Sequence, residues 1–230
     1  IDPIMHDVKS ELKTSTLEFL TEYSVSHKDF NDPEIKRCCI SIFKNSTNDY
    51  SDIEVANTIK LYSNLISNEE NFHLQGSDEE IFLKYLKNES DLIIIASAKA
   101  LSKVKAMSSV EKVVERLKEM ASKNEEVRNA LIDALIYMEA NLIYSKSELS
   151  PSKKKEALVL IRDTFITILS SEGVRKIIPL QAKLLYGLNF FVVDIDATEY
   201  INLDSIKKII TLLPVTTDEE IKGKIGKLLG

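Results

Sequence analysis

Six basic side chains are the residues of this sequence best placed to bind a charged partner. They lie in segments that recur along the chain and that we expect to line one surface. The candidate partner-binding residues are Lys99, Lys103, Arg128, Arg175, Lys176 and Lys183. Ammonium and guanidinium groups on one surface attract an acidic peptide, a phosphorylated segment or a nucleic-acid backbone. The alternative is that these six residues only keep helix surfaces solvated.

The overall charge of the chain helps to choose between these partners. The formal net charge is −6 and the pI is about 5.3, whereas most nucleic-acid-binding domains are basic. The recurring segments are nevertheless net positive, so the rest of the chain is strongly acidic. We therefore predict a protein partner with an acidic or phosphorylated segment and place nucleic acid second.

Groups that could catalyse a reaction or hold a metal are scattered. His6, His27 and His73 have no cysteine or second histidine at the spacing of metal ligands. The sequence has no glycine-rich phosphate loop, no Gly-x-Ser-x-Gly elbow and no His-Glu-x-x-His helix. We predict a non-catalytic protein without cofactor or metal.

The two cysteines and one carboxylate are expected to be buried. Cys38 and Cys39 are neighbours, which makes them a poor disulfide pair and favours two reduced thiols in the cytoplasm. Asp133 lies in a segment that is apolar on two sides. It is the carboxylate for which we expect a perturbed pKa.

The elements that position these residues are expected to be helices. The chain has six glycines and five prolines among its 230 residues, and no segment alternates apolar and polar residues as a strand would. No apolar run approaches the roughly 20 residues that cross a bilayer. Pro33 and Pro151 suit the first position of a helix, each directly after an expected cap, Asp32 or Ser150, and Ser90 and Asn124 are further expected caps. Capping boxes are expected at Ser51/Glu54, Ser77/Glu80, Ser108/Glu111 and Thr217/Glu220.

Five of the expected helices share a pattern. Each opens with an apolar residue, usually followed by Lys or Arg, with small or apolar residues four, seven and eight places later. These helices are expected at 33–45, 90–105, 125–145, 173–193 and 218–229. The openings Val127, Val174 and Ile221 are equally spaced. Such self-similarity is typical of stacked helical repeats, and we take each of the five as the second helix of a pair.

Two stretches of this pattern resemble the second helix of HEAT repeats. They are Asn124-Glu125-Glu126-Val127-Arg128 with Ala134-Leu135, and Asp32-Pro33-Glu34-Ile35-Lys36 with Ile42-Phe43. The resemblance is specific in the units that begin near Asp32, Asn124 and Asp218. The unit at Ile93 lacks the basic residue, and Pro179 is expected to split the fourth helix.

The resemblance implies a right-handed superhelix of paired helices whose second helices line the concave side, with proteins or nucleic acids as partners. We therefore predict an all-α chain that forms a single domain over 1–230, a right-handed α-solenoid of about five HEAT-like pairs. An irregular helical bundle is the alternative fold. The predicted function is a scaffold, adaptor or chaperone-like subunit that binds a protein along this concave face.

The alternative function is nucleic-acid binding, including a DNA glycosylase-like enzyme, because alkylpurine DNA glycosylases built from HEAT-like repeats are similar in length. This chain has no tryptophan to stack on a base, and we expect Tyr137 and Tyr144 in the core instead. Lys153-Lys154-Lys155 could hold an anion or simply be solvated. The chain stops directly after its last expected helix. That ending predicts a fragment of a longer chain, or self-association through Ile221, Ile225 and Leu229.

Overall fold

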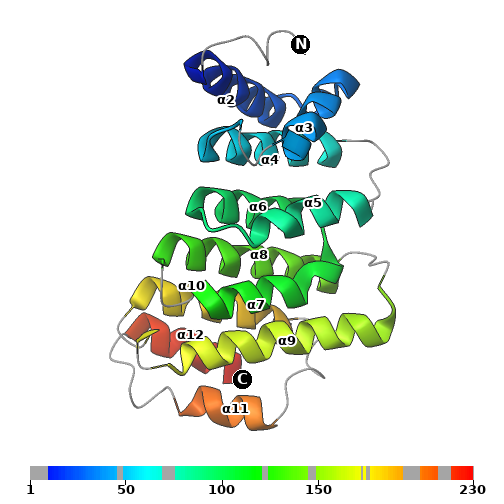
Figure 1. Ribbon diagram of the computed structural model, residues 1–230. Helices are drawn as coiled ribbons and strands as arrows, with labels where there is room; N and C mark the ends of the chain where they lie inside the picture. Colours follow the sequence, from blue (N-terminus) through cyan, green and yellow to red (C-terminus); the bar gives the residue numbers. More distant parts are fainter. Residues whose placement is uncertain are drawn as a thin grey trace. The chain divides into compact units, whose positions relative to one another are not determined.

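The structure of the chain is a computed structural model that describes residues 10–45, 49–68, 76–120, 124–144, 149–171, 173–174, 177–193, 203–211 and 219–229. Within these ranges every regular element is a helix, which confirms the all-α prediction (Figure 1). None of the described helices has both the length and the apolar character needed to cross a membrane. The helices are α2 (Ser10–Ser26), α3 (Pro33–Asn45), α4 (Asp52–Ser67), α5 (Gly76–Leu86), α6 (Asp91–Lys103), η1 (Met107–Ser109), α7 (Val110–Met120), α8 (Glu125–Tyr144), α9 (Pro151–Leu169), α10 (Ile178–Val193), α11 (Leu203–Ile210) and α12 (Glu219–Leu229).

The chain divides into two compact units. The first unit is Ile1–Ala134 and the second is Leu135–Gly230, so the boundary falls inside α8. A boundary within a helix is not a linker, and the single domain over 1–230 stays a prediction. Each unit is described by itself below.

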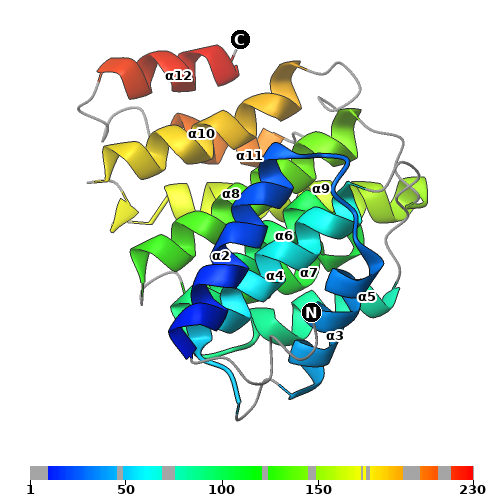
Figure 2. The same ribbon diagram turned by 90° about the horizontal axis from the view of Figure 1, so that it is seen from above.

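The first unit arranges its helices in two layers. In one layer α2 contacts α4 and α4 contacts α6, so that these three helices lie side by side (Figures 1 and 2). In the other layer α3 packs on α4, α5 packs on α6, and α7 follows next to α5. The middle helix α4 is therefore covered on several sides, and nearly all its residues between Glu54 and Ile66 are buried.

The position of α3 corrects one sequence-based expectation. Its bounds are as predicted, but it does not share a layer with α6. Instead α3 lies next to α5, where the Tyr85 hydroxyl donates to the Phe43 carbonyl oxygen at 3.2 Å and the two rings are 5.5 Å apart. The expected anchors Ile35, Cys39 and Ile42 are buried. Any helix with one buried face produces that pattern, so the pattern could not reveal the layer.

Several helix starts follow the local sequence as predicted. Ser51 forms the capping box of α4: its backbone N–H donates to the Glu54 carboxylate at 2.7 Å, and its hydroxyl accepts from the Glu54 N–H. The Asp32 carboxylate accepts the first free N–H groups of α3. The Asn124 side chain does the same for α8. These caps satisfy N–H groups that have no partner within the helix.

Other expected caps do not form: the Ser90 side chain makes no capping hydrogen bond to α6, and two expected capping boxes are missing. Ser77 lies inside α5, which already begins at Gly76. The Ser108 hydroxyl donates to the Glu79 carboxylate at 2.7 Å rather than pairing with Glu111. For Ser108, folding brings Glu79 close, and Glu79 replaces the neighbour in sequence, Glu111, as the hydrogen-bond partner. Thr217 lies outside the described residues.

In the second unit α10 packs on α9 and on α12, and α11 contacts α9 and α12. A Cβ on Gly187 would lie 2.5 Å from the Phe165 ring and 3.2 Å from Ile136, so α10 approaches α9 and α8 closely here. The expectation that Pro179 splits its helix is wrong, because α10 begins at Ile178. Pro179 is thus in the first turn, where a missing N–H costs nothing.

Candidate partner-binding surface

The structure brings two of the six predicted basic residues together and adds a third. Lys99 and Lys103 are exposed on α6, and Lys60 is exposed on the adjacent α4. We call these three residues the lysine cluster. Burial is the main cause that lowers the pKa of Lys60; the charge of Lys99 lowers it further, whereas Glu18 acts in the opposite direction. Exposed lysines on two adjacent helices thus place positive charge on this part of the surface.

Lys103 is held by a buried amide. Its ammonium donates to the side-chain oxygen of Asn64, and burial lowers the pKa of Lys103. The amide nitrogen of Asn64 donates in turn to the Ser24 hydroxyl at 2.8 Å and lies 3.4 Å from the Thr21 carbonyl oxygen. One side chain of α4 therefore links α2 to α6.

Asn64 contacts both neighbouring helices, Ser24 across a separation of 40 residues and Lys103 across one of 39. Lys60 and Lys99 are also 39 residues apart. The other hydrogen bonds between α2 and α4 join residues 36 to 44 positions apart. These contacts show that α2, α4 and α6 lie side by side in one layer.

Lys60 is positioned in the same way as Lys103. Its ammonium donates to the side-chain oxygen of Asn57 at 3.3 Å, and the Asn57 carbonyl oxygen accepts from the Thr21 hydroxyl. Amide oxygens orient an ammonium group without cancelling its charge, whereas carboxylates would neutralise it. The cluster therefore presents oriented positive charge, opposed in part by Glu18.

The other predicted residues are placed differently. The Arg128 side chain is only 12% exposed and lies 3.8 Å from Glu125, so the expectation of an exposed cation is wrong here. Lys183 is half-buried on α10 of the second unit and already has a contact. Arg175 and Lys176 lie outside the described residues.

The sequence-based prediction did not include Lys60, because it placed α3 and not α4 in the same layer as α6. With α2 and α4 in that layer, carboxylates outnumber basic residues on both added helices. The positive charge is therefore local to the lysine cluster and does not extend along the whole layer. The signal that could have found Lys60 is the shared offset between α4 and α6.

Nothing among the described residues forms a metal site, since no three His, Cys, Asp or Glu side chains come together there. Cys38 and Cys39 are buried thiols and form no disulfide, as predicted. Burial, followed by the neighbouring Cys38, raises the pKa of Cys39 to about 12. A thiol that stays protonated at neutral pH is a poor nucleophile.

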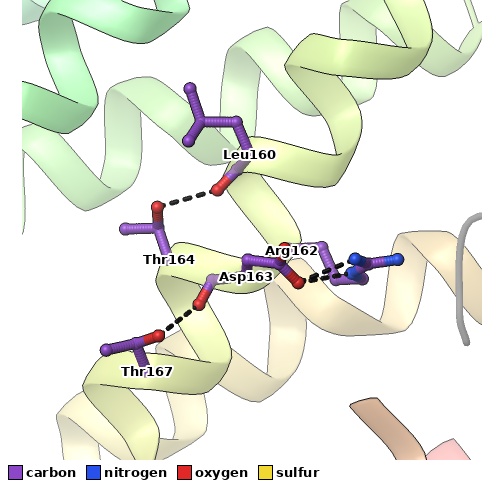
Figure 3. A network of polar contacts seen from close by, with 5 residues as sticks. All are labelled: Leu160, Arg162, Asp163, Thr164 and Thr167. Atoms are coloured by element: carbon purple, nitrogen blue, oxygen red, sulfur yellow. Dashed lines mark hydrogen bonds and ion pairs between the residues drawn. The ribbon is translucent and has the colours of Figure 1, made fainter. Parts of the chain in front are cut away.

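The buried cation of α9 in the second unit, Arg162, is paired and not available to a partner. The guanidinium of Arg162 is buried and donates twice to the carboxylate of its neighbour Asp163, at 2.7 and 2.9 Å (Figure 3). Thr164 and Thr167 donate to carbonyl oxygens one turn earlier. The run 153–155 occupies the first turn of α9, where Ser150 caps the helix as predicted. Its role as an anion site stays untested.

Two expectations about α8 are corrected by the structure. Tyr137 and Tyr144 are 63% and 58% exposed rather than packed in the core. Asp133 is half-buried and has a contact, whereas the fully buried carboxyl of this helix is Glu139. Neither oxygen of Glu139 has a hydrogen-bond partner within the described part of the chain. Burial raises its pKa well above the usual value.

The predicted apolar patch on the last helix is covered at one point. Ile225 is buried, and its helix α12 packs on α10. The side chains of Ile221 and Leu229 lie outside the described residues. Self-association through this helix stays a prediction.

Comparison with known proteins shows a similar fold but no family. No family model matches the sequence, and no curated protein matches it either. The structure resembles the crystal structure of an engineered protein, a structural genomics target, with a TM-score of 0.56 and 15% sequence identity over 99% of this chain and 92% of that one. At this identity the similarity concerns the fold alone.

Proposed function

We propose that this chain is a non-catalytic binding module that holds an acidic or phosphorylated segment of a protein partner against the lysine cluster. The observation that carries the proposal is that three exposed lysines, Lys60, Lys99 and Lys103, lie on the adjacent helices α4 and α6. An anionic partner would gain favourable electrostatic interactions with such a group of positive charges.

The polar residues beneath the cluster support this proposal. Asn57 and Asn64 are buried, and their amide oxygens fix two of the three ammonium groups. Side chains fixed before binding lose less conformational entropy when a partner arrives. No ion pair to a carboxylate within the described residues neutralises the cluster, so the charge stays available.

We further propose that the fold is a HEAT-like right-handed α-solenoid and that the protein works in the cytoplasm. The alternation of successive helices between two layers, α2, α4 and α6 in one and α3, α5 and α7 in the other, supports a repeat of helix pairs. The layer that contains α6 would then be the concave side. An irregular bundle would instead lack such an alternation.

The test is binding of a short fluorescein-labelled peptide rich in aspartate and glutamate, followed by fluorescence anisotropy. Replacing both Lys60 and Lys99 with glutamine is expected to weaken binding by about two- to tenfold, because each exposed charge pair contributes modestly. The salt dependence of binding should also become shallower. Lys103 is left unchanged because its replacement would disturb Asn64.

The matched control replaces Lys87 and Lys118 with glutamine. Both are exposed lysines of the first unit that lie outside the α2, α4 and α6 layer. The control should bind the peptide like the original protein. Equal losses in both double variants, or no loss in either, would contradict the proposed surface.

Nucleic-acid binding remains the second candidate because Tyr137 and Tyr144 are exposed and could stack on bases. A labelled single-stranded oligonucleotide tests it in the same assay. Replacing both tyrosines with leucine would weaken oligonucleotide binding if they stack on bases. Tighter binding of the oligonucleotide than of the acidic peptide, together with that loss, would reverse the order of the two functions.

A further inference from the structure

A hollow of about 610 Å³ lies in the first unit where α2 ends and α3 begins. It is separate from the lysine cluster in its residues, all of which come from α2, α3 and the turn between them. The side chains that matter for its chemistry are Tyr23, His27, Asp29, Phe30, Glu34 and Arg37. Three of these are aromatic, and two of the other three are carboxylates.

The aromatic side chains form one wall in fixed positions. The rings of Tyr23 and His27 are stacked 3.9 Å apart at an angle of 12°, and Phe30 meets Tyr23 edge-on at 5.0 Å. The His27 ring is held by a hydrogen bond from its Nδ1 to the Tyr23 carbonyl oxygen, at 3.1 Å. Phe19 also stacks on Tyr23, with the ring centroids 6.0 Å apart. Tyr23 as a whole residue is 37% exposed, and this exposed part is what a ligand can reach.

The charges around this wall favour a cation. Asp32 already caps α3, whereas Asp29 and Glu34 are exposed and have no ion pair among the described residues. Arg37 is the single cation in the lining. The C-terminal end of α2 adds a partial negative charge at the same place. Negative charge beside the π face of an aromatic ring is the environment that ammonium and guanidinium groups prefer.

We propose that this hollow binds a cationic side chain, arginine or lysine, of a polypeptide partner. The charged end of the side chain would lie against the exposed part of Tyr23 and face Asp29 and Glu34, and its aliphatic part would lie against Phe30. The binding preference is therefore opposite in sign to that of the lysine cluster. The two sites depend on different residues and can be tested separately.

The experiment follows the aromatic resonances of Tyr23 and His27 by NMR while a small probe is added. The probes are N-acetyl-arginine amide and N-acetyl-lysine amide, and N-acetyl-norleucine amide serves as the uncharged control. We expect at least one cationic probe to shift these resonances in a saturable way. Failure of both cationic probes, or equal binding of the uncharged probe, would overturn the proposal.

Two variants test the charges directly. Replacing Asp29 with asparagine and Glu34 with glutamine should weaken probe binding by about two- to tenfold. The control variant Glu80→Gln/Glu89→Gln removes two exposed carboxylates of the same unit that lie outside the hollow. It should leave binding unchanged. Equal binding by the two double variants would contradict the role of the carboxylates.

A second pair of variants tests the aromatic wall. Tyr23→Phe keeps the ring and should keep binding, whereas Tyr23→Leu should weaken it by about two- to fivefold, which corresponds to an exposed cation–π contact. Thermal unfolding of each variant shows whether the fold is retained. A folded Tyr23→Leu protein that binds as well as Tyr23→Phe would overturn the aromatic part of the proposal.

Discussion

Asn64 in the first unit and Glu139 in the second are both almost completely buried, at 5% and 0% exposed, yet they differ in whether their polar side-chain atoms have hydrogen-bond partners. The Asn64 amide bonds to Ser24 on α2 and to Lys103 on α6. The Glu139 carboxyl has no hydrogen-bond partner within the described residues. Burial alone therefore does not tell whether a polar side chain stabilises its surroundings.

The difference has separate consequences for the two units. In the first unit a satisfied polar group fixes the register of three helices and orients a lysine at the surface. In the second unit the unsatisfied carboxyl of Glu139 has a raised pKa, because ionising it without a partner is costly. Stability of the second unit should consequently depend on pH through this one residue, whereas Asn64 does not titrate.

The largest effect is expected from Asn64→Leu. This change removes the bonds to Ser24 and Lys103 and leaves the buried Ser24 hydroxyl without its donor, so the free energy of unfolding should fall by about 2–4 kcal/mol. Chemical denaturation measures this change. A loss below that of a surface substitution would show that the link between α2 and α6 contributes little to stability.

Glu139→Met is expected to raise the free energy of unfolding, because Met fills a similar volume without a polar group. At neutral pH the variant should be more stable by about 1–3 kcal/mol. Because the pKa of Glu139 is raised in the folded state, the original protein loses stability as pH rises above the ordinary value of 4.5. The advantage of the variant should therefore grow from acid to neutral pH. A constant difference across that range would contradict the raised pKa.

Gly187→Ala tests how tightly the second unit is packed near α8. The new Cβ would meet the buried Phe165 ring at 2.5 Å, and such overpacking destabilises by about 1–3 kcal/mol. In Gly223→Ala the Cβ meets nothing within 4 Å, so α12 should gain about 0.5–1 kcal/mol from helix propensity. Melting temperatures should move in opposite directions, and movement in the same direction would refute the close approach.

The smallest effect is expected from Asn68→Ala in the first unit. Its amide makes one hydrogen bond, to the Ser24 carbonyl oxygen at 3.2 Å, and is half-buried. Loss of that bond should cost about 0.5–1.5 kcal/mol. The ratio of this change to that of Asn64→Leu measures how far the stability depends on Asn64 itself.

Local features of the fold could be predicted from the sequence because they depend on a few neighbouring residues. The caps at Asp32, Ser51 and Asn124 formed as expected for that reason. Ser108 did not, since folding brought the Glu79 carboxylate within reach. The packing of the helices depends on such distant contacts, which periodicity does not encode.

Prediction of the candidate site from the sequence was also limited to residues that a local pattern identifies. Lys99 and Lys103 could be identified because they follow an apolar helical pattern. Lys60 could not, because its part in the cluster depends on α4 lying next to α6. Glu139 was missed for a related reason: the apolar pattern of α8 does not tell which of its carboxylates, Asp133 or Glu139, is buried until the surrounding helices are placed.

Hydrogen–deuterium exchange of the protein with saturating acidic peptide tests whether α4 and α6 hold an acidic segment. Backbone amide exchange should become slower in the C-terminal halves of α4 and α6, around Lys60 and Lys103, and should not change in α3 and α9. Protection confined to other helices, or no protection at saturation, would contradict this prediction.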